Sequence, residues 1–181
     1  MKYYSQPWVA QDAFVAETLK FKTEGFFVDI GCHEFDNMSN TYFLENDLNW
    51  KGLAVDIECT FKEGWDKHRP NSIFICHDAT TLDYQSILDH IQAPKVIDYL
   101  SVDTEPPQTS LDSLIKIMET DYVFRIITFE TDHYTGDLTA KDPSRKLLKE
   151  KGYIFVKSES DQDDFWFHSS MIEDLNYEPK V

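Results

Sequence analysis

The stretch FFVDIGCHEFDNMSNT, residues 26–41, joins an apolar run to a polar segment that contains a single glycine. A short apolar run that ends at turn residues is typical of a buried strand, and Gly31 allows the chain to turn tightly there. A dinucleotide-binding turn would carry further glycines to hold a pyrophosphate. The stretch therefore predicts a strand that ends beside a ligand site, without the loop that a pyrophosphate needs.

Length and charge narrow the class of protein. The chain has 181 residues, 41% of them hydrophobic, which suits one domain spanning residues 1–181. Its formal net charge of −16 argues against a nucleic-acid partner, because phosphate binding depends on clustered Lys and Arg. No run of about 18 apolar residues is present, and the N-terminal MKYYSQPW lacks the apolar core of a signal peptide. We expect a cytoplasmic protein that binds neither nucleic acid nor membrane.

The cysteines give a second expectation about the chain's surroundings. Cys32, Cys59 and Cys76 are odd in number and have no CxxC spacing. This pattern argues against a disulfide framework and against a structural zinc site. We expect three reduced thiols that act as small apolar side chains near the ends of the first three strands.

Apolar runs rich in Val, Ile, Phe and Tyr alternate along the chain with segments of helical periodicity. That alternation predicts an α/β fold, in which helices cover both faces of a mostly parallel sheet. The last two strands are joined by the short acidic segment ESDQDD, which permits only antiparallel pairing. A seven-stranded sheet that ends in an antiparallel hairpin is therefore expected, with strands at 26–30, 53–57, 72–76, 97–102, 125–129, 153–157 and 165–168.

Helices are expected between these strands. Residues 9–21 and 109–118 each place apolar side chains on one face. In DPSRKLLKEKG, Asp142 can cap a helix, Pro143 can occupy its first position and Gly152 can end it in a left-handed conformation. The last residues, 176–181, are expected to fray.

Acidic side chains follow the ends of five successive predicted strands. The carboxyl ends of parallel strands meet at one edge of a sheet, where ligands bind in folds of this kind. One such acid could be a helix cap or a turn residue, but five strands in succession are harder to explain in that way. These acids and their polar neighbours are Asp29, Asp56, Glu58, His77, Asp78, Asp103, Glu105, Glu130, Asp132 and His133.

The spacing of two acids suggests a nucleoside. Asp56 lies about 25 residues after Gly31, where nucleotide-binding folds place the acid that accepts hydrogen bonds from ribose hydroxyls. Asp78 could then accept one from the exocyclic amine of adenine. A diphosphate beside Glu34 and Asp36 would be repelled, which argues against a nicotinamide dinucleotide. S-adenosylmethionine carries a cationic sulfonium and no phosphate, so it suits an acidic rim better.

Several segments, taken in order, resemble the FkbM family of S-adenosylmethionine-dependent methyltransferases. The resemblance covers nearly the whole chain, and its most specific parts are VDIG joined to SNTYFLE, and IDYLSVDTE. It implies a Rossmann-like class I methyltransferase fold, a three-layer sandwich, with S-adenosylmethionine as the cofactor. The matching segments are YYSQPWVAQD, GFFVDIGCHEFDNMSNTYFLE, GLAVDIE, HDAT, IDYLSVDTE, ITFETDHY, GYIFV and DDFWFH.

The resemblance also implies which residues bind the cofactor. Two residues would form its loop after the first strand, two would begin the following helix beside its amino-acid end, and two acids would take the ribose and the adenine. An N-terminal Q-D pair would close over the site. In that order, these residues are Asp29 and Gly31, Asn40 and Thr41, Asp56 and Asp78, and Gln11 and Asp12.

On the acceptor side, the resemblance places Asp103 and Glu105 of the family's D-x-E motif near the transferred methyl group. Glu130, with His133 nearby, falls at the acidic motif after the fifth strand. Methyl transfer to a hydroxyl oxygen requires alignment of the reactants and the removal of one proton. We predict that Asp103 and Glu105 orient the acceptor, and that the base is Asp103, Glu105 or His133.

Three departures from the family pattern bear on cofactor binding and activity. The first loop, CHEFDN, holds less glycine than the family's, so the cofactor could bind less tightly than the motif implies. The second-strand acid is Asp56 followed by Ile57, rather than Glu followed by Pro, and either acid can accept hydrogen bonds from ribose. After D-x-E the chain continues with Pro106, Pro107 and Gln108, where the family has Gly-Ser-Glu. Because prolines remove backbone donors and stiffen a loop, the acceptor pocket should differ from the family's.

Two functions of different class follow. The first is an O-methyltransferase that acts on a small hydroxylated acceptor such as a sugar or glycan, and the second is an inert binding module whose EPPQ loop marks lost activity. Asp103, Glu105 and Asp132 could also hold Mg²⁺ or Ca²⁺ through oxygen ligands, although a metal is not favoured. The small chain has no insertion to form a large lid, so the site is either open or completed by a second subunit of a homo-oligomer.

Overall fold

A seven-stranded sheet forms the centre of residues 1–171, the part of the chain that this computed structural model describes. The strands lie side by side in the order β3-β2-β1-β4-β5-β7-β6. The first five pair in parallel, and β7 runs antiparallel to both of its neighbours. Their bounds are β1 (Phe26–Ile30), β2 (Lys51–Asp56), β3 (Ser72–Cys76), β4 (Val96–Val102), β5 (Val123–Glu130), β6 (Tyr153–Glu159) and β7 (Asp163–His168).

The predicted α/β fold, the seven strands and the C-terminal antiparallel hairpin are confirmed. β1 and β3 have the predicted bounds, and the other strands begin and end within about two residues of theirs, a common uncertainty at element ends. The turn at residues 160–162 is too short for a crossover, so β7 folds back against β6. The expected fraying of residues 176–181 lies outside the described residues.

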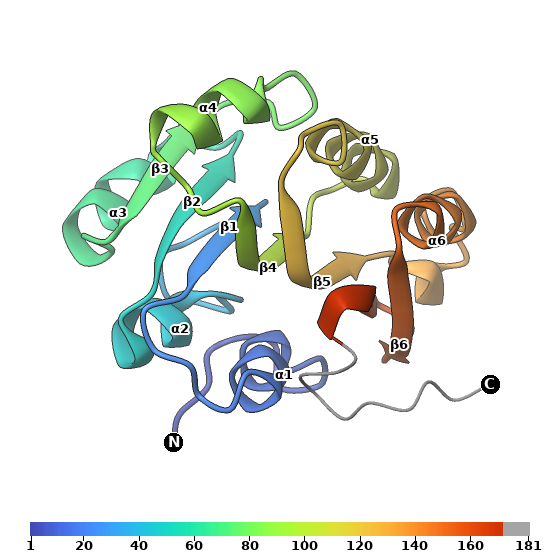
Figure 1. Cartoon of the computed structure of the whole chain (residues 1–181), viewed down its shortest axis with the longest axis horizontal. Coiled ribbons are helices and arrows are strands. Elements are labelled where there is room, and N and C mark those ends of the chain that lie inside the picture. Colours follow the sequence, from blue (N-terminus) through green and yellow to red (C-terminus); the bar gives the residue numbers. More distant parts are fainter. Residues whose placement is uncertain (172–181) are drawn as a thin grey trace.

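Helices cover both faces of this sheet. Figure 1 shows α4, α5 and α6 along one face, α1 and α2 along the other, and α3 beside β3. None of the helices within residues 1–171 is long and apolar enough to cross a membrane. Their bounds are α1 (Gln11–Thr18), α2 (Tyr42–Leu48), α3 (Lys62–His68), α4 (Tyr84–His90), α5 (Pro107–Ile117) and α6 (Lys141–Glu150), with short 3₁₀ turns η1 (Cys59–Phe61), η2 (His133–Thr135) and η3 (Ser169–Met171).

The start of α6 differs from the sequence expectation, whereas the residue that follows its end agrees with it. The prediction that Asp142 caps α6 is wrong, because Ala140 occupies the N-cap and Asp142 and Pro143 lie in the first turn. Ala140 is fully buried in the core, which anchors the chain there and lets the helix begin earlier. Gly152 adopts the predicted left-handed conformation, with φ of 87°.

Alternate residues of each strand face the two sides of the sheet and pack into different cores. Val28 and Ile30 of β1 belong to the larger core, under α4, α5 and α6, whereas Phe27 packs with α1 and α2. The register aligns Ile30 with Val55 of β2 and with Val102 of β4, so that the chain leaves these strands at one edge. The acids that follow the strands are thereby brought to a common rim.

Cysteine pairing contradicts the sequence expectation. Cys59 and Cys76 form a disulfide, and Cys32 is a buried free cysteine, so the prediction of three reduced thiols is wrong for two of them. The 3₁₀ turn after β2 brings Cys59 beside the last residue of β3, a contact that the spacing of 17 residues does not reveal. Disulfides persist in oxidising surroundings, so the cytoplasmic location stays a prediction.

Candidate active site

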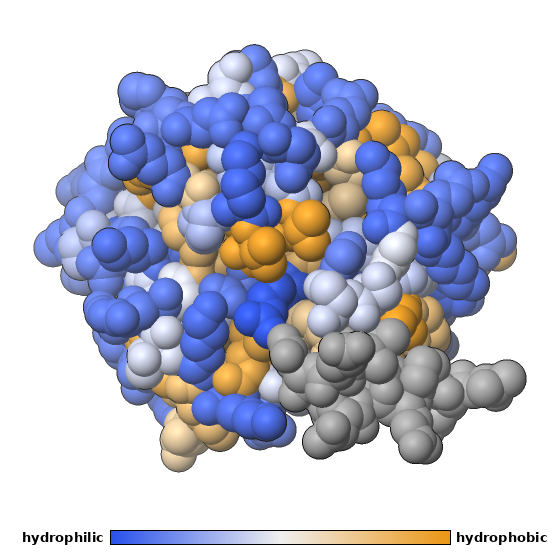
Figure 2. Space-filling model, in the orientation of Figure 1, coloured by the Kyte–Doolittle hydropathy of each residue, from blue (hydrophilic) through white to orange (hydrophobic). Residues whose placement is uncertain are grey.

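A cavity of about 690 Å³ lies where the first five strands end, and its wall includes an acid from each of them. Its size falls within the range of small-molecule sites, which is roughly 300 to 1,000 Å³. Figure 2 shows a largely hydrophilic face in which apolar side chains gather near the centre. In sheet order from β3 to β5, the acids in the cavity wall are Asp78, Asp56, Asp29, Asp103 and Glu130, with Glu105 after β4 and Asp112 on α5.

Asp29, on β1, is a buried acid, and one of its two carboxylate oxygens has no hydrogen-bond partner. Its side chain is 1% exposed, and its Oδ2 accepts a hydrogen bond from Thr41 Oγ1 at 2.7 Å. Its Oδ1 is buried and has no partner, although Asp29 lines the cavity. Burial raises the pKa of Asp29 to about 6, while the hydrogen bond from Thr41 opposes that rise. An unpartnered buried oxygen at a cavity wall is suited to a ligand that donates a hydrogen bond.

Thr41 supports Asp29 from behind and is not among the cavity residues. Its hydroxyl receives a hydrogen bond from Arg69 Nη2 at 3.0 Å. Arg69 is 1% exposed, pairs with Glu45 at 2.7 Å and lies 4.1 Å from the ring centre of Trp65. The sequence interpretation did not include Arg69, since a lone arginine in α3's C-terminal flank gives no sign of burial.

Gly31 allows the chain after β1 to approach the chain after β4. It has φ of 81°, and a Cβ atom there would lie 1.8 Å from the carbonyl oxygen of Asp103. The predicted tight turn is present, and Gly31 lines the cavity. The backbone of Asp103 comes too close to Gly31 for any side chain to fit there. Packing therefore requires this glycine, as does the turn.

Asp56 and Asp78, at the ends of β2 and β3, are held by hydrogen bonds from nearby loop residues. Asp56 accepts from the backbone N–H groups of His33 and Glu58, both at 2.8 Å. Asp78 accepts from Thr80, at 2.9 Å from its backbone N–H and at 2.7 Å from its hydroxyl. These bonds hold the pKa of Asp78 below its ordinary value. Both carboxylates are thus fixed in position without a ligand.

Asn40 joins the first loop to the end of β4. Its Nδ2 donates to Ser101 Oγ at 3.0 Å and to Asp103 Oδ2 at 3.2 Å, whereas its Oδ1 is buried and has no partner. The loop after Asp103 is held by Ser110 of α5, whose hydroxyl accepts from the backbone N–H of Thr104 at 3.0 Å and donates to its carbonyl at 2.6 Å. Asp103 is therefore positioned from two directions.

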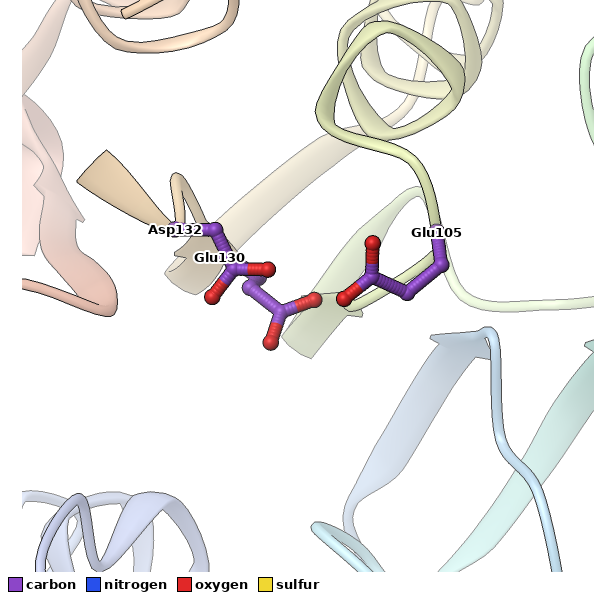
Figure 3. Close-up of side chains that lie close together, drawn as sticks. All are labelled: Glu105, Glu130 and Asp132. Carbon is purple, nitrogen blue, oxygen red and sulfur yellow. The ribbon is translucent and has the colours of Figure 1, made fainter. Parts of the chain in front are cut away.

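Glu105, Glu130 and Asp132 form a cluster of carboxylates at the ends of β4 and β5. Figure 3 shows the three side chains directed toward one another, and one oxygen from each lies within 4.8 Å of the others. Burial raises the pKa of Glu130, and the nearby charge of Asp103 adds to that rise. Burial also raises the pKa of Asp132, together with a hydrogen bond shared with Glu105.

Three other residues assigned to the site lie away from the cavity wall. His133 is in η2, where its Nδ1 lies 2.8 Å from Thr131 Oγ1 and its Nε2 lies 3.1 Å from Asp161 Oδ1. Asp12 accepts from Ser5 Oγ at 2.5 Å and from the backbone N–H of Tyr4. Gln11 donates to Asp163 at 3.2 Å. The Q-D pair therefore anchors the N-terminal segment.

The cavity also contains residues that the sequence interpretation did not assign to it. Some are neighbours of predicted residues and could have been found from that adjacency. Gln6, Thr109 and Asp112 come from the N-terminal segment and from α5, and only the fold brings them to the strand ends. The additional neighbours are Asn37, Met38, Ile57, Ala79, Thr80 and Thr104, with Val55 at the end of β2. Cys32, which was expected as a small apolar side chain at the end of the first strand, also lines the cavity, together with His33.

Comparison with known proteins adds fold information. No protein-family model and no curated protein matches the chain. Among solved structures, a protein assigned as an rRNA methylase from Clostridium thermocellum is 16% identical, with a TM-score of 0.56 over 86% of this chain and 93% of that one. A TehB-like SAM-dependent methyltransferase from Corynebacterium glutamicum is 10% identical, with a TM-score of 0.57 over 87% and 86%.

A third similar structure contains bound ligands. It is the 1,6-didemethyltoxoflavin-N1-methyltransferase of Burkholderia thailandensis, with 1,6-didemethyltoxoflavin and S-adenosylhomocysteine bound. This protein is 14% identical, with a TM-score of 0.51 over 87% of this chain and 74% of that one. The chain thus has a Rossmann-like class I methyltransferase fold, whereas membership of the FkbM family stays a prediction.

Proposed function

We propose that this chain is an S-adenosylmethionine-dependent methyltransferase of the FkbM type, which methylates a hydroxyl oxygen of a small acceptor such as a sugar or glycan. The observation that carries the proposal is the acid-lined cavity at the ends of five successive strands. Among residues 1–171, no Lys or Arg lines that cavity. A cationic nucleoside without phosphates fits such a wall, whereas a diphosphate would meet like charge.

Two buried oxygens without hydrogen-bond partners indicate where the amino-acid end of the cofactor would bind. Asp29 Oδ1 and Asn40 Oδ1 are buried acceptors without donors, and both residues line the cavity. The ammonium group of a bound amino acid has three N–H donors and a positive charge, and it would satisfy such oxygens. We assign Asp29, Gly31 and Asn40 to this end of the cofactor, with Thr41 holding Asp29 in place.

The nucleoside end is assigned to Asp56 and Asp78. Each oxygen of Asp56 receives one backbone N–H, and a carboxylate oxygen can accept a second hydrogen bond. Asp56 can therefore accept from ribose hydroxyls without giving up the bonds that fix it. Asp78 uses Oδ1 for Thr80, which leaves its Oδ2 for an adenine amine.

The acceptor is assigned to the rim beyond β4. When bound, S-adenosylmethionine supplies a methyl group that is activated by its cationic sulfur. Asp103 would take the proton of the acceptor hydroxyl as the new oxygen–carbon bond forms and the carbon–sulfur bond breaks. Asp103 suits this role because it lines the cavity and is held by Asn40. Glu105 would orient the acceptor, and His133 stays a weaker candidate for the base because both of its ring nitrogens have protein partners.

The EPPQ loop no longer favours an inert binding module. Pro107 is the first residue of α5, a position where proline is preformed for a helix and its missing N–H is not needed. The two prolines are therefore explained by the start of a helix. Net charge and the absence of basic cavity residues among residues 1–171 support a small-molecule or glycan partner over nucleic acid.

Calorimetry tests the cofactor assignment. We expect S-adenosylmethionine and S-adenosylhomocysteine both to bind, and Asp56→Ala to weaken each by about tenfold or more through lost ribose hydrogen bonds. Asp66→Ala is the matched control, since Asp66 is exposed on α3 and pairs with Lys62 outside the cavity. The assignment fails if the wild-type protein releases no heat with either compound.

Transfer of a labelled methyl group to a panel of hydroxylated acceptors tests the activity. We expect Asp103→Asn to lower kcat by about 100-fold or more while its affinity for S-adenosylhomocysteine stays within about threefold of wild type. Binding of the cofactor without transfer to any acceptor in the panel would contradict the enzyme assignment and support the binding module.

A further inference from the structure

The carboxylate cluster of Glu105, Glu130 and Asp132 has a geometry that the proposed reaction does not explain. Glu105 lies on the loop after β4, Glu130 is the last residue of β5, and Asp132 follows two residues later. Their oxygens lie within 4.8 Å of one another, and Figure 3 shows the carboxyl groups directed into a common space. Three like charges at this separation repel one another strongly unless something neutralises them.

Hydrogen bonding within the protein leaves part of this cluster unsatisfied. Glu130 is 9% exposed and Asp132 is 5% exposed. The Oε2 atom of Glu130 and the Oδ1 atom of Asp132 are buried and have no hydrogen-bond partner. Buried oxygens without a donor are costly, and native structures normally satisfy them with protein, water or an ion.

No neighbouring cation compensates for these charges. Within residues 1–171, none of the three acids forms an ion pair with Lys or Arg. Asp103 and the 2% exposed Asp163 are further acidic groups close to Glu130.

We propose that Glu105, Glu130 and Asp132 bind a hard divalent cation of the Mg²⁺, Mn²⁺ or Ca²⁺ class. All three ligands are carboxylate oxygens, which these ions prefer, whereas a zinc site would be expected to include His or Cys. The remaining coordination positions would be filled by water or by a ligand in the cavity that Glu105 and Glu130 line. The sequence had grouped Asp103 with Glu105 and Asp132, and the structure replaces Asp103 with Glu130.

Binding of the ion does not depend on methyl transfer. In the proposed reaction, a cation at this position would coordinate the acceptor hydroxyl and lower its pKa, which would assist the removal of its proton by Asp103. That consequence rests on the proposed function, whereas the ion site can be tested on the protein alone. The two proposals can therefore fail separately.

Titration of the metal-free full chain with Mn²⁺, followed by electron paramagnetic resonance of the free ion, tests the site. We expect one Mn²⁺ per chain with a dissociation constant below about 1 mM, and displacement by Mg²⁺ or Ca²⁺. Asp132→Asn and Glu130→Gln should each weaken Mn²⁺ binding by about tenfold or more. No S-adenosylmethionine is added, so the result is independent of the cofactor assignment.

Asp112→Asn is the matched control for the loss of one negative charge. Asp112 lines the same cavity but accepts a hydrogen bond from Gln108 and lies outside the cluster. It should change Mn²⁺ affinity by less than about threefold. The proposal is overturned if wild type shows no saturable Mn²⁺ binding up to about 1 mM, or if Asp132→Asn and Asp112→Asn bind equally well.

Thermal unfolding separates loss of the site from loss of the fold. Saturating Mn²⁺ should raise the Tm of the wild-type protein and of Asp112→Asn, because an ion that binds only the native state stabilises it. Asp132→Asn should unfold cooperatively and show no such rise. An equal Mn²⁺-dependent rise in Asp132→Asn would overturn the proposal, since the ion would then bind elsewhere.

Discussion

The acidic rim of the cavity has a nucleoside side and an acceptor side, and its carboxylates differ between the two in hydrogen bonding and in the direction of their pKa shifts. On the nucleoside side, Asp56 and Asp78 each accept two hydrogen bonds from nearby loop residues, and the bonds from Thr80 lower the pKa of Asp78. On the acceptor side, Glu105, Glu130 and Asp132 face one another, and burial raises the pKa of the last two. Carboxylates at strand ends are therefore held by protein donors on one side of the rim and face other carboxylates on the other side.

This difference shows which side depends on a ligand. The acids of the nucleoside side are held in place without a ligand by backbone and threonine donors. The acceptor side keeps buried oxygens without partners, a cost that folding alone does not require. Local features that oppose stability gather at functional sites, so the acceptor side is where we place the ion and the chemistry.

The largest expected effect on the free energy of unfolding is at Gly31, where the two sides of the rim meet. Gly31→Ala should lower the free energy of unfolding by about 3 kcal/mol or more, because it adds a left-handed alanine and a Cβ against the Asp103 carbonyl. Gly136→Ala is the control, since Gly136 also has a positive φ but nothing within 4 Å of the added Cβ. It should cost about 1 kcal/mol. Urea unfolding measures both, and equal losses would contradict the close packing of the two sides.

A smaller effect, up to about 3 kcal/mol, is expected at Asp29, which lies between the sides. Its native pKa of about 6 exceeds the ordinary 3.8, so the native protein holds this proton more tightly than the unfolded chain does. The stability that Asp29 contributes is full below pH 3.8 and is lost as the pH rises to about 6.

Asp29→Asn removes this titration and keeps an oxygen that can accept from Thr41. Its free energy of unfolding, relative to wild type, should therefore rise as the pH increases from 3.8 to about 6 and should change little above that. Urea unfolding across this range measures the difference. A difference that is constant with pH would show that Asp29 titrates normally and that the rim is less buried between its two sides.

The smallest effect concerns the loop that carries the acceptor side. Ser110→Ala should lower the free energy of unfolding by about 1 kcal/mol, because the serine hydroxyl bonds both backbone groups of Thr104. Ser113→Ala is a matched control on the same helix, since its hydroxyl is equally buried and has no partner. It should be neutral or slightly stabilising. Urea denaturation measures both variants, and equal losses of stability would contradict the role that we assign to Ser110 in holding this loop.

Most of the fold follows from local signals in the sequence. Strands such as β1 and β3 were predicted with their exact bounds because continuous apolar runs end at turn residues. Asp56 and Asp78 were placed correctly at the rim because parallel strands end at one edge. These features depend on short-range pattern and on a general rule of sheet geometry.

The remaining features depend on which segments become neighbours. The Cys59–Cys76 disulfide requires η1 to fold back toward β3, and the burial of Arg69 requires its contact with Glu45 of α2. The grouping of Glu130 with Glu105 depends on the lateral packing of two strand ends. None of these contacts can be inferred from the local sequence. The sequence therefore predicted which acids lie at the rim, but not that they form two distinct groups.

A crossed binding measurement tests the separation of the two sides most directly. S-adenosylhomocysteine binding by calorimetry and Mn²⁺ binding by paramagnetic resonance are measured on Asp56→Ala and on Asp132→Asn. We predict that Asp56→Ala loses about tenfold or more in affinity for S-adenosylhomocysteine and keeps Mn²⁺ binding within about threefold, and that Asp132→Asn does the reverse. Variants that each lose both ligands to a similar extent, or that lose neither, would contradict a rim divided into a nucleoside side and an ion-binding acceptor side.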